Sequence, residues 1–156
     1  MVSVKFNIRS LRFIFRIDKI ARPIGVTSKL RDGRHILMWD FDNQLAAEVQ
    51  FNLLNIQLKH SLSHIYILQS SPGDNYIAYC FNAYPFKEAF SIVGNTPGVD
   101  FNFLRFSMMR EYFTLRISKT QLRPQPEGAF FLRGISEPDA GIDDLAYFVR
   151  YETIKK

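Results

Sequence analysis

Apolar and polar residues alternate along three stretches of the chain, Leu11–Asp18, Tyr112–Ser118 and Leu145–Thr153. A half-buried β-strand gives this pattern, because successive side chains point to opposite faces of a sheet. Upstream of the first stretch, Phe6 and Ile8 continue the alternation. We therefore expect a longer strand or a hairpin at the N-terminal end, and one strand in each of the other two stretches.

Further strands are predicted by continuous apolar runs at Arg34–Phe41, His64–Gln69 and Asn75–Phe81. The Ser70–Asp74 segment between the last two runs contains Pro followed by Gly. This dipeptide favours a type II turn, so these two strands should form a hairpin.

Helical spacing of apolar residues predicts connecting helices between these strands. Gln44–Lys59 carries one apolar stripe, and Asn43 is a suitable N-cap for that helix. A second helix should begin at Pro85 and end at Gly94. Asp100–Arg110 is compatible with a third, short helix.

The predicted order over residues 34–118 is strand, helix, strand, strand, helix, strand. This order is typical of the α+β class with a ferredoxin-like, RRM-like βαββαβ core, in which two helices cover one face of an antiparallel sheet. Right-handed crossovers would place the first and third core strands in the middle of that sheet. Residues 1–33 and 119–156 would add N- and C-terminal strands to a single domain of 1–156.

The composition changes this picture little. The 156 residues are 47% hydrophobic and carry a net charge of +5, which is compatible with a nucleic-acid partner but is also found in proteins that bind none. Arg12 and Arg16 on the first alternating strand could contact phosphates, or could form an ordinary solvated face. The single Cys80 excludes an internal disulfide, and no apolar run reaches about 18 residues, so we expect a cytoplasmic protein without a membrane span.

Two carboxylates, Asp40 and Asp42, end the central strand one residue apart. Side chains two positions apart in a strand share a face, so the two charges should repel and raise at least one pKa unless a cation lies between them. Mg²⁺ or Mn²⁺ is the kind of ion that such a pair of carboxylates would bind. The alternative is a strand that ends in a solvated turn, with Asp42 or Asn43 capping the next helix.

Phosphate-binding groups occur elsewhere in the same core. The turn that contains Ser70, Ser71 and Gly73 offers hydroxyls and backbone N–H groups. Arg110 or Arg116 could neutralise phosphate oxygens. Together with paired carboxylates on a sheet face, these residues indicate a candidate phosphoryl-transfer site.

Two segments resemble motifs of the archaeo-eukaryotic primase superfamily. Met38–Asp42 is similar to its hydrophobic-Asp-hydrophobic-Asp motif. Leu68–Gly73, leading into Asn75–Tyr79, resembles its second motif, in which a Ser-Ser-Pro-Gly-like turn precedes a strand. The predicted order of helices and strands also matches the core of that family, and the resemblance covers about residues 34–118.

The resemblance implies a small primase–polymerase-like nucleotidyltransferase that acts in DNA replication of a virus or mobile element. It would use a DNA or RNA template, nucleoside triphosphates and two Mg²⁺ or Mn²⁺ ions at Asp40 and Asp42, and replication proteins could be partners. The family's third acidic residue is expected on the last core strand, and Glu111 is the nearest carboxylate, ahead of Asp100. Asn75 would join the nucleotide-binding turn.

Two departures from the family pattern support a different hypothesis. Ile77 stands where the second motif has His, and Thr114 and Arg116 occupy the outward positions of the last core strand. The alternative is a catalytically degenerate domain that binds single-stranded nucleic acid on the same fold. Exposed aromatic residues such as Tyr76 or Tyr79 would then stack on bases, unless these rings belong to the core. A purely structural role is the third hypothesis.

Overall fold

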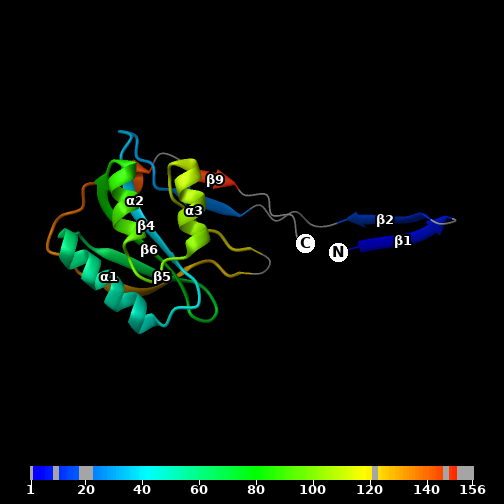
Figure 1. The fold of residues 1–156 in the computed structure, drawn as a ribbon, viewed down its shortest axis with the longest axis horizontal. Coiled ribbons are helices and arrows are strands. Elements are labelled where there is room, and N and C mark those ends of the chain that lie inside the picture. Colours follow the sequence, from blue (N-terminus) through cyan, green and yellow to red (C-terminus); the bar gives the residue numbers. More distant parts are fainter. Residues whose placement is uncertain (1, 9–10, 18–22, 121–122, 146–147, 151–156) are drawn as a thin grey trace.

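The chain forms, in order, β1 (Val2–Ile8), β2 (Leu11–Ile17), β3 (Ile24–Thr27), β4 (His35–Phe41), α1 (Ala46–His60), β5 (Ile65–Ser71), β6 (Asn75–Tyr84), α2 (Phe86–Gly94), α3 (Phe101–Arg110), β7 (Thr114–Arg116), β8 (Glu127–Leu132), the 3-10 helix η1 (Ile142–Asp144) and β9 (Phe148–Arg150). The computed structural model describes residues 2–8, 11–17, 23–120, 123–145 and 148–150, with the backbone alone for β1, β2 and β9 (Figure 1). Of the helices in these ranges, none has the length and apolar character needed to cross a membrane.

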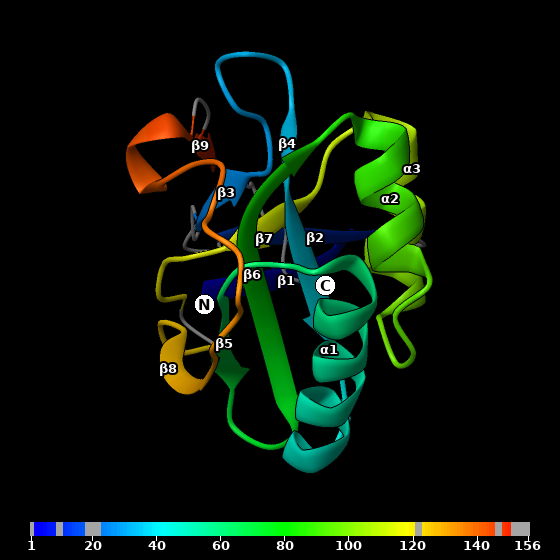
Figure 2. The same cartoon turned by 90° about the vertical axis from the view of Figure 1, so that its left-hand side faces the viewer.

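The strands form antiparallel sheets, as the α+β prediction requires. One sheet has the order β4-β6-β5-β8, a second has the order β7-β3-β9, and β1 pairs with β2. The helices α1, α2 and α3 lie on the same side of the four-stranded sheet (Figure 2). The ferredoxin-like order of strands and helices is thus confirmed, with α3 inserted before the last core strand and with flanking strands at both ends.

The position of β4 differs from the prediction in one respect. β4 pairs with β6, so the first and third core strands are neighbours as expected, but β4 lies at the end of the sheet order and not in its middle. The reason is that β7, the last core strand, does not pair with β4. It pairs instead with β3, a strand that the alternation pattern did not predict. β3 pairs with β7, and the next residue, Ser28, bonds to both sides: its N–H donates to the Phe113 carbonyl at 3.0 Å, and its carbonyl accepts from Ile36 N–H at 3.0 Å.

The turn after β4 also differs from the prediction. Asn43 is not the N-cap of α1; it adopts a positive φ of 56°, a conformation that Asn tolerates, and the N-cap is Leu45. Two bonds explain this shift: Asn43 N–H donates to Asn75 Oδ1 at 3.3 Å, and Gln44 N–H donates to the Asp74 carbonyl at 2.9 Å. The chain is therefore held against the β5–β6 turn for two residues before the helix can begin.

The β5–β6 hairpin itself is confirmed, with antiparallel pairing from Ile65 and Cys80 to Ser71 and Asn75. Gly73 in its turn has φ of 87°, which glycine adopts at little cost because it lacks a Cβ. The predicted short helix before β7 is also confirmed as α3. Its N-cap is Asp100, whose Oδ1 accepts from Phe103 N–H at 2.6 Å.

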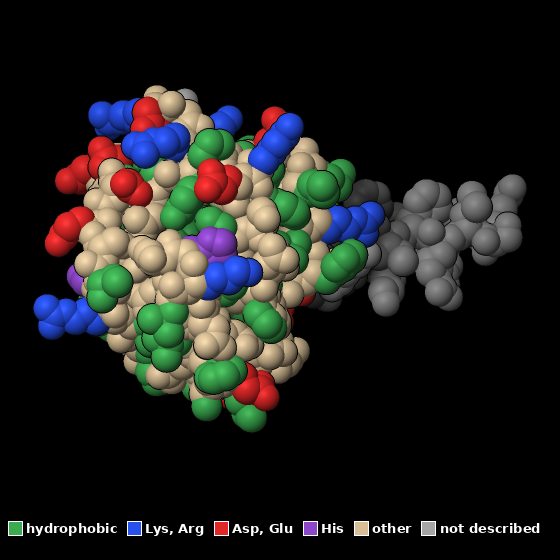
Figure 3. Space-filling view, turned by 60° about the vertical axis from the view of Figure 1, so that its left-hand side comes forward, with side chains coloured by type: hydrophobic (Ala, Val, Ile, Leu, Met, Phe, Trp, Pro, Cys, Tyr) green, Lys and Arg blue, Asp and Glu red, His purple; other side chains and the backbone are tan. Residues whose placement is uncertain are grey.

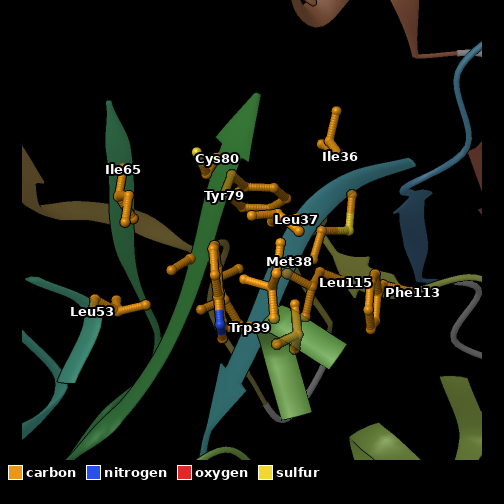
Figure 4. Packing of buried hydrophobic residues seen from close by; sticks show 14 of the residues in the cluster. Ile36, Leu37, Met38, Trp39, Leu53, Ile65, Tyr79, Cys80, Phe113 and Leu115 are labelled. Atoms are coloured by element: carbon orange, nitrogen blue, oxygen red, sulfur yellow. The ribbon is translucent and has the colours of Figure 1, made fainter. Parts of the chain in front are cut away.

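The core lies between the four-stranded sheet and the helices. Leu37 and Trp39 of β4 are fully buried together with Leu53 of α1 and Ile65 of β5 (Figure 4). Trp39 is the largest of these side chains, and its indole N–H donates to the hydroxyl of Thr96 at 2.8 Å. This bond satisfies the one polar atom of the ring, so that the whole side chain can be buried.

Phe113 extends this core to the other two helices. Its ring lies 5.6 Å from that of Phe86 and 6.3 Å from that of Phe90, both on α2, and 5.6 Å from that of Phe103 on α3. Phe113 therefore packs against both α2 and α3.

Cross-strand pairing assigns the β4 side chains to two faces of the sheet. Trp39 pairs with Ala78, and these residues belong to the face that the helices cover, which we call the helix face. Asp40 pairs with Ile77, and Met38 pairs with Tyr79. Directly paired residues share a face and neighbours along a strand alternate, so these four residues lie on the opposite face, which we call the site face.

Candidate functional site

Asp40 is a half-buried carboxyl group near the end of β4, on the site face. Asp42 follows two residues later, just beyond the strand, and is exposed. The two carboxylates are close enough for the charge of Asp42 to disfavour ionisation of Asp40. The expected like-charge pair is thus present, and only one of its members is withdrawn from water.

The pKa of Asp40 is raised to about 7. Burial is the largest cause, followed by the charges of Asp42 and Asp100, while Arg123 and Arg116 act in the opposite direction. Burial and the two carboxylates therefore outweigh the two guanidinium groups. A cation bound beside Asp40 would lower this pKa by favouring the ionised carboxylate.

Asp100 is the third carboxylate that the structure brings to this site. Its N–H donates to the Asp40 carbonyl at 2.8 Å, which joins the beginning of α3 to the end of β4. Glu111 instead follows the last residue of α3, adopts a positive φ of 58° and is exposed. Since ten helical residues span about 15 Å, Glu111 is a helix length away from Asp100 and is not brought to the pair.

The carboxylates are compatible with a magnesium ion but do not enclose one. Within the described part of the chain, no group of three or more His, Cys, Asp or Glu side chains is arranged to hold a metal ion. Mg²⁺ keeps several waters and commonly binds through one or two carboxylates and the phosphates of a substrate. Asp40 and Asp42 match that donor set.

Arg116 connects the site face to three neighbouring segments. Its guanidinium donates to the carbonyls of Ser70 at 2.6 Å and Pro124 at 2.7 Å, and also to the carbonyl of Ser118. Burial lowers the pKa of Arg116, and the nearby charge of Arg123 lowers it further. The sequence predicted an outward position for Arg116 but left open whether Asp40 shares that face, and the charge of Arg116 does act on Asp40.

Of two other arginines, Arg123 was missed by the sequence analysis and Arg110 was predicted at the site but lies elsewhere. The charge of Arg123 lowers the pKa of Asp40. Arg123 belongs to a Pro-containing loop and not to a strand or helix, so no periodic pattern in the sequence indicates this position. Arg110 is exposed at the far end of α3, and its guanidinium lies over the ring of Phe106 at 5.6 Å. The structure does not bring Arg110 to the carboxylates.

The hairpin turn lies beside the end of β4 through the bonds to Asn43 and Gln44 described above. Ser70 is buried, Ser71 is half-buried, and the Gly73 carbonyl accepts from Gln69 Nε2 at 2.8 Å and from Asn75 N–H at 3.0 Å. The side chain of Asn75 fastens this turn, since Nδ2 donates to the Pro72 carbonyl at 3.2 Å and Oδ1 accepts from Asn43 N–H.

The aromatic residues proposed for stacking are not exposed. Tyr76 is 6% exposed, lies on the helix face opposite Phe41, and packs 6.1 Å from the ring of Phe130. Tyr79 is also buried. The alternative in which these rings are exposed for stacking is therefore wrong, and the alternative in which they belong to the core is confirmed. Exposed rings on this sheet belong instead to Tyr66, at 43%, Phe130, at 37%, and Phe131, at 53%. The centroids of the Tyr66 and Phe131 rings are 5.3 Å apart.

The basic residues do not form one patch on the face shown in Figure 3, where Lys and Arg side chains are interspersed with Asp and Glu. Arg12 and Arg16 fall on β2, where they pair with Asn7 and Ser3. Their side chains lie outside the described part of the structure.

Comparisons of the chain with protein-family models, with curated proteins and with solved structures gave no match.

Proposed function

We propose that the protein is a primase–polymerase-like nucleotidyltransferase, which joins nucleotides on a DNA or RNA template in the replication of a virus or mobile element. The observation that supports this most directly is the environment of Asp40. Its carboxyl group is half-buried at the end of an antiparallel strand, where the charges of two other carboxylates and of two arginines act on it. A nucleoside triphosphate with its divalent ion presents complementary charges of both signs.

In this proposal Asp40 and Asp42 hold Mg²⁺ or Mn²⁺, with Asp100 as the neighbouring carboxylate. When bound, such ions neutralise phosphate charge and activate the attacking hydroxyl group. Arg116 and Arg123 contribute positive charge toward the phosphates. Arg116 is well suited to this role because its bonds to backbone carbonyls fix its orientation before any ligand binds.

A template-dependent incorporation assay tests the proposal. We expect labelled nucleotide to be incorporated with Mg²⁺ or Mn²⁺, and Asp40→Asn or Asp42→Asn to lower the rate by at least about a hundredfold. Asp143→Asn is the matched control, since Asp143 is an exposed carboxylate in η1. Equal rates in all three variants, or no incorporation with either ion, would contradict catalysis at this site.

A second candidate function is a degenerate domain that binds single-stranded nucleic acid. It is favoured by Ile77, which lies directly opposite Asp40 and cannot contact phosphate through a polar side chain, and by the exposed rings of Tyr66 and Phe131. This candidate predicts salt-sensitive binding of a labelled single strand that survives both a chelator and Asp40→Asn. Loss of binding on addition of a chelator would count against it.

A further inference from the structure

A cavity of about 620 Å³ lies on the site face of the four-stranded sheet. Its floor includes Tyr66 and Leu68 of β5 and Tyr79 and Phe81 of β6. Tyr66 pairs with Tyr79, and Leu68 pairs with Ile77, the same residue that pairs with Asp40. The cavity and the carboxylates therefore share one face. Small-molecule sites commonly occupy about 300–1,000 Å³, so the volume is sufficient for a ligand.

The lining of the cavity is mostly apolar and aromatic. Tyr66 packs edge-on against Phe81, with ring centroids 6.0 Å apart and an angle of 79° between the rings. Two of the polar atoms in the lining already have partners: the Ser63 hydroxyl contacts the Cys80 thiol at 3.6 Å, and His64 Nδ1 accepts from Gly134 N–H at 3.1 Å. Such walls suit a flat group that is contacted through its ring faces.

The cavity begins close to the charged site. Tyr79 pairs with Met38, two residues before Asp40, and such diagonal neighbours in a sheet are about 7–8 Å apart. Arg116 lies close enough to Asp40 for the two charges to interact, and the next residue, Ile117, lines the cavity. It also holds the Pro124 carbonyl, and the next residues, Gln125 and Pro126, line the cavity. Arg116 thus lies where the charged site and the apolar cavity meet.

We propose that this cavity receives the base of the nucleotide whose phosphates lie at Asp40 and Arg116. The inference rests on the proposed function, because it assumes that phosphates bind at the carboxylates and arginines. A base in the cavity would contact the rings of Tyr66 and Phe81. Every base has a π-face, and few polar groups in the lining can distinguish one base edge from another. We therefore expect ATP and UTP to bind with affinities within about fivefold of each other.

Calorimetric titration of the full chain with ATP, UTP and inorganic tripolyphosphate, each with Mg²⁺, tests this inference. The two nucleotides should bind at least about tenfold more tightly than tripolyphosphate, because only they carry a base. Leu68→Trp, which fills the cavity, should remove this difference while leaving tripolyphosphate binding unchanged. Tyr66→Ala, at a partly exposed position, is a second variant that removes a ring without filling the core, and it should have the same effect. Phe51→Ala on the outer surface of α1 is the matched control, because Phe51 is an exposed ring remote from the cavity.

The outcomes separate the two proposals. If ATP, UTP and tripolyphosphate bind equally well, or if both cavity variants bind ATP as the unmodified protein does, the base does not enter the cavity, whereas the phosphate site stands. If neither the nucleotides nor tripolyphosphate bind, the proposed function is itself contradicted, and the base-binding role of the cavity is rejected with it.

Discussion

The two faces of the four-stranded sheet differ in what fixes their residues. On the helix face, Leu37, Trp39 and Ile65 are buried without charge, and their packing stabilises the fold. On the site face, one residue along the same strand, a carboxyl group is held at a raised pKa beside two others. The contrast indicates that the helix face contributes stability, while the site face retains an arrangement that costs stability. Such local cost is commonly associated with function.

The largest effect that we predict is on the helix face. Trp39→Ala should lower the free energy of unfolding by about 3–5 kcal/mol, because it leaves a cavity and removes the donor to Thr96. Denaturant titration measures this change. Phe131→Ala, which removes an exposed ring near the site face, should cost only about 1 kcal/mol or less. Similar losses for the two variants would contradict the distinction between the faces.

The next effect has the opposite sign and lies on the site face. The pKa of Asp40 is raised in the folded state, so the folded protein holds its proton more tightly than the unfolded chain does. The stability that this proton provides is therefore present at low pH and is lost as the pH rises from about 4 to about 7. Asp40→Asn should consequently stabilise the metal-free protein by about 2 kcal/mol at pH 8 and by less at pH 5.

Thermal unfolding at the two pH values, with a chelator present, measures this difference. Asp143→Asn is again the control, and it should change stability by less than about 0.5 kcal/mol at either pH. A destabilised Asp40→Asn at pH 8 would show that the carboxylate is paired and not repelled.

A smaller effect is predicted for Arg116, and it tests whether the hydrogen bonds of this side chain hold it in place before any ligand binds. Arg116→Lys should lower the free energy of unfolding by about 1–2 kcal/mol, because one ammonium group cannot reproduce a guanidinium fork bonded to three carbonyls. Arg110→Lys on the exposed end of α3 should change it by less than about 0.5 kcal/mol. Chemical denaturation of both variants measures the two changes. Equal losses for Arg116→Lys and Arg110→Lys would show that the Arg116 guanidinium is not held by its bonds to the carbonyls.

The smallest predicted effect concerns the hairpin turn. Gly73→Ala should cost about 1 kcal/mol, because an L-residue is strained at a φ of 87° even though its Cβ would meet only Asn75 Nδ2, at an ordinary contact distance of 3.7 Å. Gly94→Ala at the end of α2 is the control, where no positive φ is required, and it should be neutral or slightly stabilising. Thermal denaturation of the two variants should separate them clearly.

Sequence periodicity predicted most of the helix face. The strands, the hairpin and the helices follow from apolar spacing, because burial on one side repeats with the period of the element. Periodicity missed β3, since its four residues carry too little alternation to distinguish a strand from a loop. It also placed the start of α1 too early, because the bonds that hold Asn43 and Gln44 come from a turn thirty residues away.

The site face was predicted less completely for a different reason. Asp40 and Asp42 are separated by one residue, so their pairing could be anticipated, but the face of the sheet that Asp40 occupies depends on the strand register. Asp100 and Arg123 arrive through long connections, and no local pattern carries that information. The burial of Tyr76 could not be predicted either, because an aromatic residue in a strand gives the same sequence pattern whether it faces the helices or the solvent.

The bonds that join the end of β4 to the hairpin turn restrict how this region can change in length. The backbone N–H groups of Asn43 and Gln44 donate hydrogen bonds to Asn75 and Asp74, which are neighbours in the same turn. A single inserted residue there would move these acceptors out of reach and release the segment that carries Asp42. The turn therefore depends on the Asn75 side chain and on a glycine at position 73, and an insertion or deletion in it would release the segment that follows Asp40.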